Sequence, residues 1–268
     1  MPVSRRVGSA TVVALEDGEG PFFQPRNEAF PTATAEHWSA ADALDPRAAT
    51  GGEWRLSFRA FAVRLDDGRV VVVDAGIGPA DAPAASWAPV PGRLPDSLAE
   101  AGIDPGEVDT VVLTHLHTDH IGWAMRDGEP FFPHARYLIQ RAEVEAIRAV
   151  GAPAGPYATE PLDAAGRLDQ LDGDHRIAPG LTVRSAPGHT PGHQVVLLEA
   201  GDDAVLVTGD LLVHAVQLVA PALPYAHEMD APLARTSREA LLAELGRRPG
   251  DRLLASAHLG EPFTGLPA

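Results

Sequence analysis

Four potential metal ligands lie within one short segment of the sequence: His115, His117, Asp119 and His120. They follow residues 108–113, an apolar run that predicts a buried strand. Because side-chain direction in a strand repeats every two residues, we expect His115 and His117 to share one face. Imidazole nitrogens and carboxylate oxygens are the ligands that zinc and similar divalent cations take where no thiolate is present. The segment therefore predicts a metal site at the end of this strand.

Further His and Asp residues follow three later apolar runs, each of which predicts a buried strand. His189 and His193 come after residues 181–185, Asp210 after 204–208, and His258 after 252–256. Two sheets packed face to face would bring the ends of such strands to a common edge. We therefore expect these distant segments to build one composite site.

The elements that must position these residues alternate between strands and helices. We predict strands over residues 7–15, 55–65, 70–73, 108–113, 135–140, 181–185, 194–199, 204–208 and 252–256, and helices over 94–103, 141–150 and 232–245. An Asp-Asp-Gly turn at 66–68 predicts a hairpin of the second and third strands. Residues 151–174 are expected to be loop with a short helix. No repeat or linker divides the chain, so we predict one α/β domain over residues 1–268.

The composition limits the chemistry that this chain can use. The 268 residues include no cysteine, which excludes disulfides, thiolate-bound zinc, iron–sulfur clusters and thiol nucleophiles. The formal net charge is −16, from 21 Lys and Arg against 37 Asp and Glu, without a basic stretch. A nucleic-acid partner requires a positive surface, so none is expected. Apolar residues make up 45% of the chain, which predicts a folded protein with a large core.

The sequence contains no segment that resembles a membrane anchor. No uninterrupted apolar run reaches the roughly 20 residues that a spanning helix requires. Residues 1–15 do not resemble a secretory signal, because Glu16 and Asp17 end their short apolar run without a small-residue cleavage site. We therefore expect a cytoplasmic protein that does not contact a membrane.

Five motifs carry a family resemblance through their order and spacing across residues 70–260. They are Asp74-Ala75-Gly76, Thr-His-Leu-His-Thr-Asp-His at 114–120, Gly-His-Thr-Pro-Gly-His at 188–193, Gly-Asp at 209–210 and the late His258. Together they resemble the metallo-β-lactamase-fold hydrolase superfamily. The resemblance implies an αββα sandwich of two mixed β-sheets flanked by helices, with a dinuclear metal site at the edge between the sheets.

The same resemblance implies a role for each ligand. His115, His117 and His189 would bind the first metal, Asp119, His120 and His258 would bind the second, and Asp210 would bridge them. A carboxylate suits the bridge because its two oxygens can each reach a cation. The implied nucleophile is a hydroxide shared by the two metals, and Asp119 is the expected catalytic residue that passes a proton to the leaving group. Zinc is the expected metal, and these ligands also accept Mn, Fe or Co.

Other His and Asp residues are expected to act outside the ligand set. Asp74 resembles the family's supporting aspartate, which orients the ligand loop, and it could equally be a turn residue that ends a strand. His193 is expected to stabilise its loop rather than to bind metal. Four more histidines are expected to be ordinary surface or core residues: His37, His134, His175 and His227.

Several features separate this chain from particular branches of the superfamily. Asp210 stands where the commonest zinc β-lactamases have cysteine, and His117 stands where flavodiiron proteins have glutamate. Only ten residues follow His258 (268 − 258), so the helical glutathione-binding domain of glyoxalase II-like enzymes is not expected. The remaining resemblance is to the compact branch of lactonases, arylesterases and phosphotriesterases, which includes methyl-parathion-hydrolase-like enzymes.

Substrate contacts are expected from three segments between the strands and helices. Residues 16–54, which include Phe23, are expected to form a lid or a substrate-pocket segment. Residues 79–93 and 211–229 carry further aromatic side chains, among them Tyr225. Such lining would suit an uncharged substrate.

One position departs from the pattern of the acyl-homoserine lactonases. Those enzymes commonly place a tyrosine three residues after the bridging aspartate, where it assists the lactone carbonyl, and this chain has Val213 there. His214 is one residue further and is the other candidate for contact with the substrate. A lactonase reaction in this chain would therefore lack the tyrosine that usually assists at the lactone carbonyl.

These observations lead to one main hypothesis and two alternatives. The main hypothesis is a dinuclear metal-dependent hydrolase that cleaves a small neutral lactone or ester. The first alternative is a phosphotriester hydrolase that uses the same site, because carbonyl and phosphoryl groups both offer an oxygen to a metal. The second is a mononuclear iron redox protein or a thioester-cleaving member of the superfamily. The expected partner is a small-molecule substrate, and the family resemblance also allows a homodimer.

Overall fold

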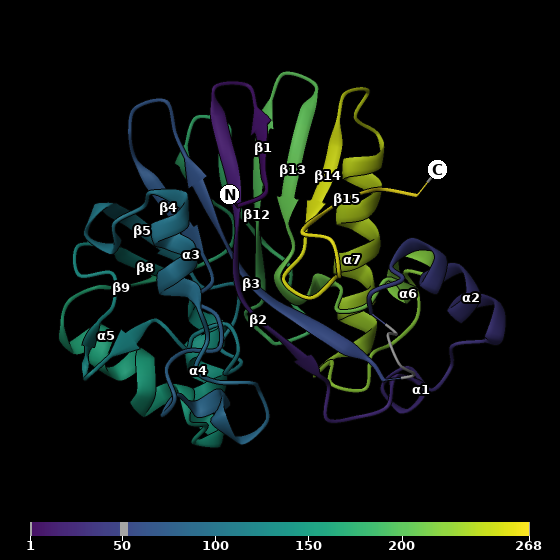
Figure 1. The fold of residues 1–268 in the computed structure, drawn as a ribbon, viewed down its shortest axis with the longest axis horizontal. Helices are drawn as coiled ribbons and strands as arrows, with labels where there is room; N and C mark the ends of the chain where they lie inside the picture. Colours follow the sequence, from purple (N-terminus) through teal and green to yellow (C-terminus); the bar gives the residue numbers. More distant parts are fainter. Residues whose placement is uncertain (1, 49–52, 268) are drawn as a thin grey trace.

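Two β-sheets pack face to face between two layers of helices (Figure 1). The computed structural model describes residues 2–48 and 53–267. In order across the first sheet, the strands are β1 (Ser4–Val7), β2 (Ala10–Pro21), β3 (Arg55–Arg64), β4 (Val70–Val73), β5 (Val108–Val112), β8 (Arg136–Gln140) and β9 (Leu168–Leu171). Those of the second are β10 (His175–Ala178), β11 (Leu181–Ser185), β12 (Gln194–Ala200), β13 (Asp203–Val207), β14 (Arg252–Ala255) and β15 (Phe263–Gly265). Both sheets mix parallel and antiparallel pairs, so the predicted αββα sandwich is confirmed.

Helices cover the outer side of each sheet (Figure 1). Those beside the first sheet are α3 (Leu94–Ala101), α4 (Arg141–Val150) and α5 (Glu160–Ala164), and those beside the second are α7 (Ala231–Gly246), α6 (Val216–Val219), α2 (Ala35–Leu44) and α1 (Arg26–Ala29). Single-turn helices lie at Pro83–Ser86, Pro105–Glu107, Gly155–Thr159 and Gly209–Leu211, and β6 (Met125–Arg126) pairs with β7 (Glu129–Pro130). No helix in the described part of the chain is long and apolar enough to cross a bilayer.

The central strand β3 shows how the core is layered. Phe61 and Val63 point to one side of β3 and belong to the cluster between the two sheets. Ala60 and Ala62 point to the other side and pack in the cluster beneath α3. Since both faces of β3 are covered, its interior residues are all buried. Packing on both faces of β3 fixes the position of one sheet relative to the other. The loops at the common edge of the sheets are positioned by that packing.

Most predicted elements are confirmed with shifts of one or two residues at their ends. β3 and β4 form the predicted antiparallel hairpin. The helices predicted at 94–103 and 141–150 are α3 and α4, and each ends at a glycine in the left-handed conformation, Gly102 and Gly151.

Two predictions about the elements are wrong. The strand predicted over 7–15 is instead a hairpin of β1 and β2, which turns at Gly8 with φ +59°. A Cβ at Gly8 would lie 2.5 Å from Ala200 Cβ, so only glycine fits there. β2 continues to Pro21, so the segment 16–54 begins inside a strand. The predicted loop 151–174 contains the edge strand β9, whose half-buried residues give a weak apolar signal.

Candidate metal centre and its pocket

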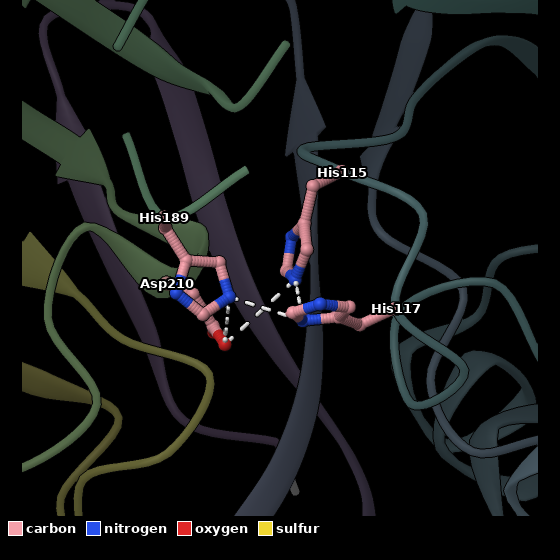
Figure 2. Close-up of side chains that lie close together, drawn as sticks. All are labelled: His115, His117, His189 and Asp210. Atoms are coloured by element: carbon pink, nitrogen blue, oxygen red, sulfur yellow. Dashed lines mark hydrogen bonds and ion pairs between the residues drawn. The ribbon is translucent and has the colours of Figure 1, made fainter. Parts of the chain in front are cut away.

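The seven predicted ligands lie at one edge of the sandwich, six of them in loops and Asp210 in the single-turn helix Gly209–Leu211. The loops follow β5 in the first sheet and β11, β13 and β14 in the second. Their ligand atoms form two groups, His115, His117, His189 and Asp210, and Asp119, His120 and His258. Figure 2 shows the first group, in which His115 and His117 face His189 and Asp210 from the opposite sheet. The centre therefore depends on how the two sheets pack against each other.

The first group brings three imidazoles and one carboxylate to a common point. His117 Nδ1 lies 2.9 Å from His115 Nε2 and 3.0 Å from His189 Nε2. Asp210 Oδ2 lies 3.2 Å from His189 Nε2 and 3.8 Å from His115 Nε2. Ligand atoms about 2.0–2.2 Å from a tetrahedral zinc ion are separated by about 3.3 Å. These four atoms therefore fit around one cation.

The second group has two imidazoles and one carboxylate. His120 Nε2 and His258 Nε2 lie 3.3 Å apart, and each is 3.5 Å from Asp119 Oδ2. Asp210 Oδ1 lies 3.0 Å from His258 Nε2 and 3.2 Å from His120 Nε2. Asp210 thus directs one oxygen to each group, as a bridging carboxylate would.

The donor set fits divalent metal ions. Asp210 Oδ1 is buried and accepts no hydrogen bond from the described residues. A buried carboxylate oxygen is costly unless it is neutralised or hydrogen-bonded, so this atom is suited to a cation. Imidazole and carboxylate ligands without thiolate are accepted by zinc and by other divalent transition metals.

The shared strand face predicted for His115 and His117 is wrong. β5 ends at Val112, and both histidines lie in the irregular loop beyond it. Leu116 between them is buried in the core beneath the loop. The rings nevertheless converge, with their centroids 4.5 Å apart. Loop conformation rather than strand periodicity therefore brings them together.

Hydrogen bonds orient the imidazoles of the second group. His120 Nδ1 donates to Asp74 Oδ2 at 2.8 Å, and His258 Nδ1 donates to the carbonyl oxygen of Ser57 at 2.9 Å. Both rings therefore carry their hydrogen on Nδ1 and present Nε2 to the centre. Asp74 also accepts the Thr114 N–H at 2.7 Å and the Thr114 hydroxyl at 2.9 Å. Asp74 thus contacts the start of the ligand loop as well as a ligand ring.

His193 lies outside both ligand groups. Its Nε2 accepts the backbone N–H of Asp210 at 3.0 Å, and its Nδ1 donates to the carbonyl oxygen of Ala186 at 3.1 Å. Burial lowers the pKa of His193 to about 3, so the ring is neutral. The structure therefore places it where it can support the bridging aspartate.

A buried glutamate that the sequence analysis missed lies beneath the ligand loops. Glu143, in the first turn of α4, accepts the Leu116 N–H at 3.0 Å and the Gly192 N–H at 2.9 Å. Its side chain is among the buried acidic groups of the structure. The sequence signal was an acidic residue in an ordinary helix, which carries no indication of a contact with distant loops.

The two groups differ in their proton affinity. Burial is the main cause that lowers the pKa of His117 to about 3 and that of His115 well below its usual value. Burial also opposes the charged form of His120, but Asp119 and Asp210 outweigh it and raise the pKa of His120. The imidazoles of His115 and His117 are thus neutral without metal, whereas those of His120 and His258 hold their protons more tightly.

An apolar pocket of about 390 Å³ opens above the metal centre. Phe23 and Val213, which are expected to contact substrate, line it together with Phe22, Trp54, Trp87 and Tyr225. His227, which was expected to be an ordinary surface or core residue, is exposed and also lines the pocket. His227 belongs to none of the sequence motifs. The tertiary structure brings it beside Phe23, with ring centroids 5.5 Å apart.

His214, the other expected substrate contact, does not line this pocket. His214 is buried away from the pocket, among the rings of Phe30, Trp38 and Trp54. Burial lowers its pKa to about 3, so it is a neutral core residue. Val213 lines the pocket, whereas the neighbouring ring of His214 packs against these aromatic side chains.

A two-sheet sandwich with clustered His and Asp residues at one edge is the fold of a known class of metal-dependent hydrolases. A comparison with known protein families identifies the same class. Residues 59–258 match the metallo-beta-lactamase superfamily, which is more than half of the chain. The chain therefore belongs to the metallo-beta-lactamase superfamily.

Several relatives of this chain are lactonases. An N-acyl homoserine lactonase of Bacillus sp is 32% identical over 119 residues, which are 44% of this chain and 44% of that protein. The N-acyl homoserine lactonase AttM of Rhizobium radiobacter is 35% identical over 111 residues, 38% of this chain and 40% of that protein. The matched segment thus spans less than half of the length of these curated relatives.

Solved structures resemble this chain over almost its whole length. AidC, a dizinc quorum-quenching lactonase solved with a product, has a TM-score of 0.79 at 19% identity, over 100% of this chain and 97% of that one. The hydrolase AbOPH of the beta lactamase superfamily has a TM-score of 0.78 at 22% identity, over the same shares of the two chains. At 19–22% sequence identity, these two similarities support the fold alone.

Proposed function

We propose that this chain is a metal-dependent hydrolase with two divalent cations, which cleaves a small neutral lactone or ester. The observation that carries the proposal is the pair of ligand groups that share Asp210 at the floor of an apolar pocket. The lactonase relatives support the choice of substrate class. The two-metal assignment is supported by Asp210, whose Oδ2 lies near His189 of the first group and whose Oδ1 lies near His258 of the second.

The pocket walls favour a neutral, apolar substrate. Among the described residues that line the pocket there is no lysine or arginine that could pair with an anion. The acidic lining groups are Asp119 and Asp210, and both are assigned to the metal ligands, so the rest of the described wall offers no Lys, Arg, Asp or Glu to a charged substrate. Phe22, Phe23 and Trp87 supply an aromatic wall on which an apolar substituent can pack. We also propose that the part of residues 16–54 that carries Phe22 and Phe23 acts as the lid of this pocket.

Asp119 is the residue that we assign to proton transfer. Bound divalent cations would supply Lewis acidity, which lowers the pKa of water and polarises the electrophilic oxygen of the substrate. Asp119 both lines the pocket and contacts the second group, so its carboxylate is close to the candidate metal centre and to the space for a substrate. The nearby His120 and His258 outweigh burial and lower the pKa of Asp119, which keeps the carboxylate ready to accept a proton. It would then return that proton to the leaving oxygen.

Tyr225 is the residue that we assign to the substrate oxygen. Its hydroxyl has no hydrogen-bond partner within the described residues, and its ring lies nearly parallel to that of His189, at 8° and 6.2 Å between centroids. Burial, together with Asp210 and Asp119, raises its pKa, so the hydroxyl remains protonated and can donate. Tyr225 would thereby provide the donor that Val213 cannot.

The backbone of Tyr225 is held firmly. Its N–H donates to Glu228 Oε2 at 3.1 Å, and Glu228 pairs with Arg238 of α7 at 2.7 Å. Both of these charged side chains are only 1% exposed, so the pair is protected from water. The phenol is therefore presented to the pocket by a rigid loop.

Metal analysis and three assays on one preparation test the proposal. The protein is purified without chelators, its metals are measured by plasma emission, and a lactone, an aryl ester and a phosphotriester are assayed. We expect about two metals per chain and chelator-sensitive hydrolysis of the lactone or the ester. Faster cleavage of the phosphotriester would favour the first alternative. One iron per chain with oxygen consumption and no hydrolysis would contradict the proposal.

A further inference from the structure

The Glu143 carboxylate joins the two loops that carry the imidazoles of the first group. Leu116, whose N–H it accepts, lies between His115 and His117 in sequence. Gly192, whose N–H it also accepts, lies three residues after His189. One oxygen, Oε1, serves the first loop and the other, Oε2, serves the second. One side chain therefore ties together the backbone of all three histidine ligands of this group.

The loop at Gly192 is packed directly against Glu143. A Cβ at position 192 would lie 2.4 Å from the backbone nitrogen of Glu143 and 2.5 Å from its Cβ. Only glycine allows this approach, and the approach is what brings the Gly192 N–H within hydrogen-bond distance. The backbone of α4 thus packs closely against the loop at Gly192, next to the Glu143 carboxylate.

The charge of Glu143 has no cationic side chain to balance it. Glu143 is 1% exposed and forms no ion pair with a described Lys, Arg or His, although it accepts two N–H groups. Glu228 is equally buried and has Arg238 as its partner. A buried carboxylate is costly unless it is hydrogen-bonded and near positive charge. A cation held by the first group would provide that charge.

We propose that Glu143 is a positioning residue for metal binding, which sets the spacing of the two loops of the first group. Asp74 contacts a ligand of the second group, whereas Glu143 acts only through backbone N–H groups of the first. The inference rests on the proposed metal centre and is independent of the substrate class.

Zinc affinity in three variants tests this role. Zn²⁺ alone is titrated into the chelator-treated full-length protein in competition with a chromophoric chelator. Glu143→Gln keeps the length of the side chain and removes its charge, whereas Glu143→Asp keeps the charge and is too short to reach both loops. Glu145→Gln is the matched control, because Glu145 is exposed on the same helix. We expect one zinc equivalent to bind about 10-fold to 100-fold more weakly in both Glu143 variants and normally in the control.

A spectroscopic measurement separates positioning from a general effect on the fold. Co²⁺ alone is added in place of zinc, and its visible absorption reports ligand geometry. We expect Glu143→Gln to change the spectrum of the first equivalent and to leave that of the second unchanged. Wild-type affinity and spectra in both Glu143 variants would overturn the proposal, as would a lower melting temperature with unchanged metal binding.

Hydrogen exchange in the wild-type chain provides a test that does not depend on the folding of a variant. The N–H groups of Leu116 and Gly192 should be protected in the metal-free protein, because Glu143 holds them before metal arrives. Rapid exchange of either N–H would overturn the proposal. A wild-type chain that binds no Zn²⁺ would overturn the metal centre and this inference together, whereas normal zinc binding in the Glu143 variants would overturn the inference alone.

Discussion

The two ligand groups of the centre are held in different ways. The first is supported through the backbone, where Glu143 accepts N–H groups from two loops. The second is supported through the ligand rings themselves, where Asp74 and the Ser57 carbonyl accept hydrogen bonds from the Nδ1 atoms of His120 and His258. Supporting a loop sets where its ligands lie, whereas supporting a ring sets which nitrogen it presents.

The difference also affects what must happen before a metal binds. Burial keeps the imidazoles of His115 and His117 neutral, so they can accept a cation directly. Neighbouring carboxylates outweigh burial at His120 and His258 and raise the pKa of both. The second group must therefore release protons before it can bind a cation.

The largest expected effect comes from the residue that the two groups share. Asp210→Ala removes an oxygen from both groups, so we expect loss of both metals and a fall in hydrolysis of about 10³-fold or more. Metal content and initial rates on one preparation check this. Loss of a single metal with full activity would show that Asp210 is not a bridge.

Removal of the second group's support should affect only one metal. Asp74→Ala leaves His120 Nδ1 without its acceptor, so its ring can turn or change tautomer. We expect about 10-fold to 100-fold weaker binding of one zinc equivalent, by chelator competition. If the same equivalent weakens in Asp74→Ala and Glu143→Gln, the two supports do not serve different groups.

Removal of the Tyr225 hydroxyl should lower turnover without a change in metal content. A hydrogen bond to developing charge contributes about 1.5–3 kcal/mol, so Tyr225→Phe should reduce kcat about 10-fold to 100-fold with a similar melting temperature. The matched control is Tyr137→Phe, because the Tyr137 hydroxyl donates to the Ala124 carbonyl and accepts the Phe132 N–H in the core. That variant should melt earlier and keep its kcat. Unchanged kcat in Tyr225→Phe would exclude the assigned role.

The smallest expected effect is on the stability of the metal-free protein. The raised pKa values of His120 and His258 contribute stability that is fully present below about pH 6.5 and is lost as the pH rises through their folded-state pKa values. The lowered pKa values of His115 and His117 reduce stability as the pH falls below about 6.5, because the unfolded chain then binds protons that the folded chain does not. The melting temperature of the metal-free protein should therefore be highest near about pH 6.5.

The metal-loaded protein is the control for this pH dependence. Bound cations displace the protons of the ligand rings, so its melting temperature should change less between about pH 6.5 and 9. Parallel curves for the metal-free and metal-loaded proteins would contradict the assigned difference between the two groups.

The sequence was most informative where a local pattern determines the structure. β3 and β4 were predictable because alternating apolar residues flank an Asp-Asp-Gly turn. α3 and α4 were predictable because helical spacing ends at a glycine. β9 was missed because an edge strand with half-buried residues lacks a continuous apolar signal. The turn at Gly8 was missed because residues 7–15 were interpreted as one continuous strand.

Residue order together with the family resemblance predicted the members of the centre, since the seven candidate ligands follow strand ends and a chain without cysteine depends on nitrogen and oxygen donors. Only the tertiary structure decided their environment, because the contacts of Glu143, His214, Tyr225 and His227 join segments that are distant in sequence. A side chain's chemistry belongs to its residue, but its burial, charge state and partners depend on what the fold packs against it. The sequence therefore predicted which residues can bind metal, and the packing of the two sheets determined how those residues are held.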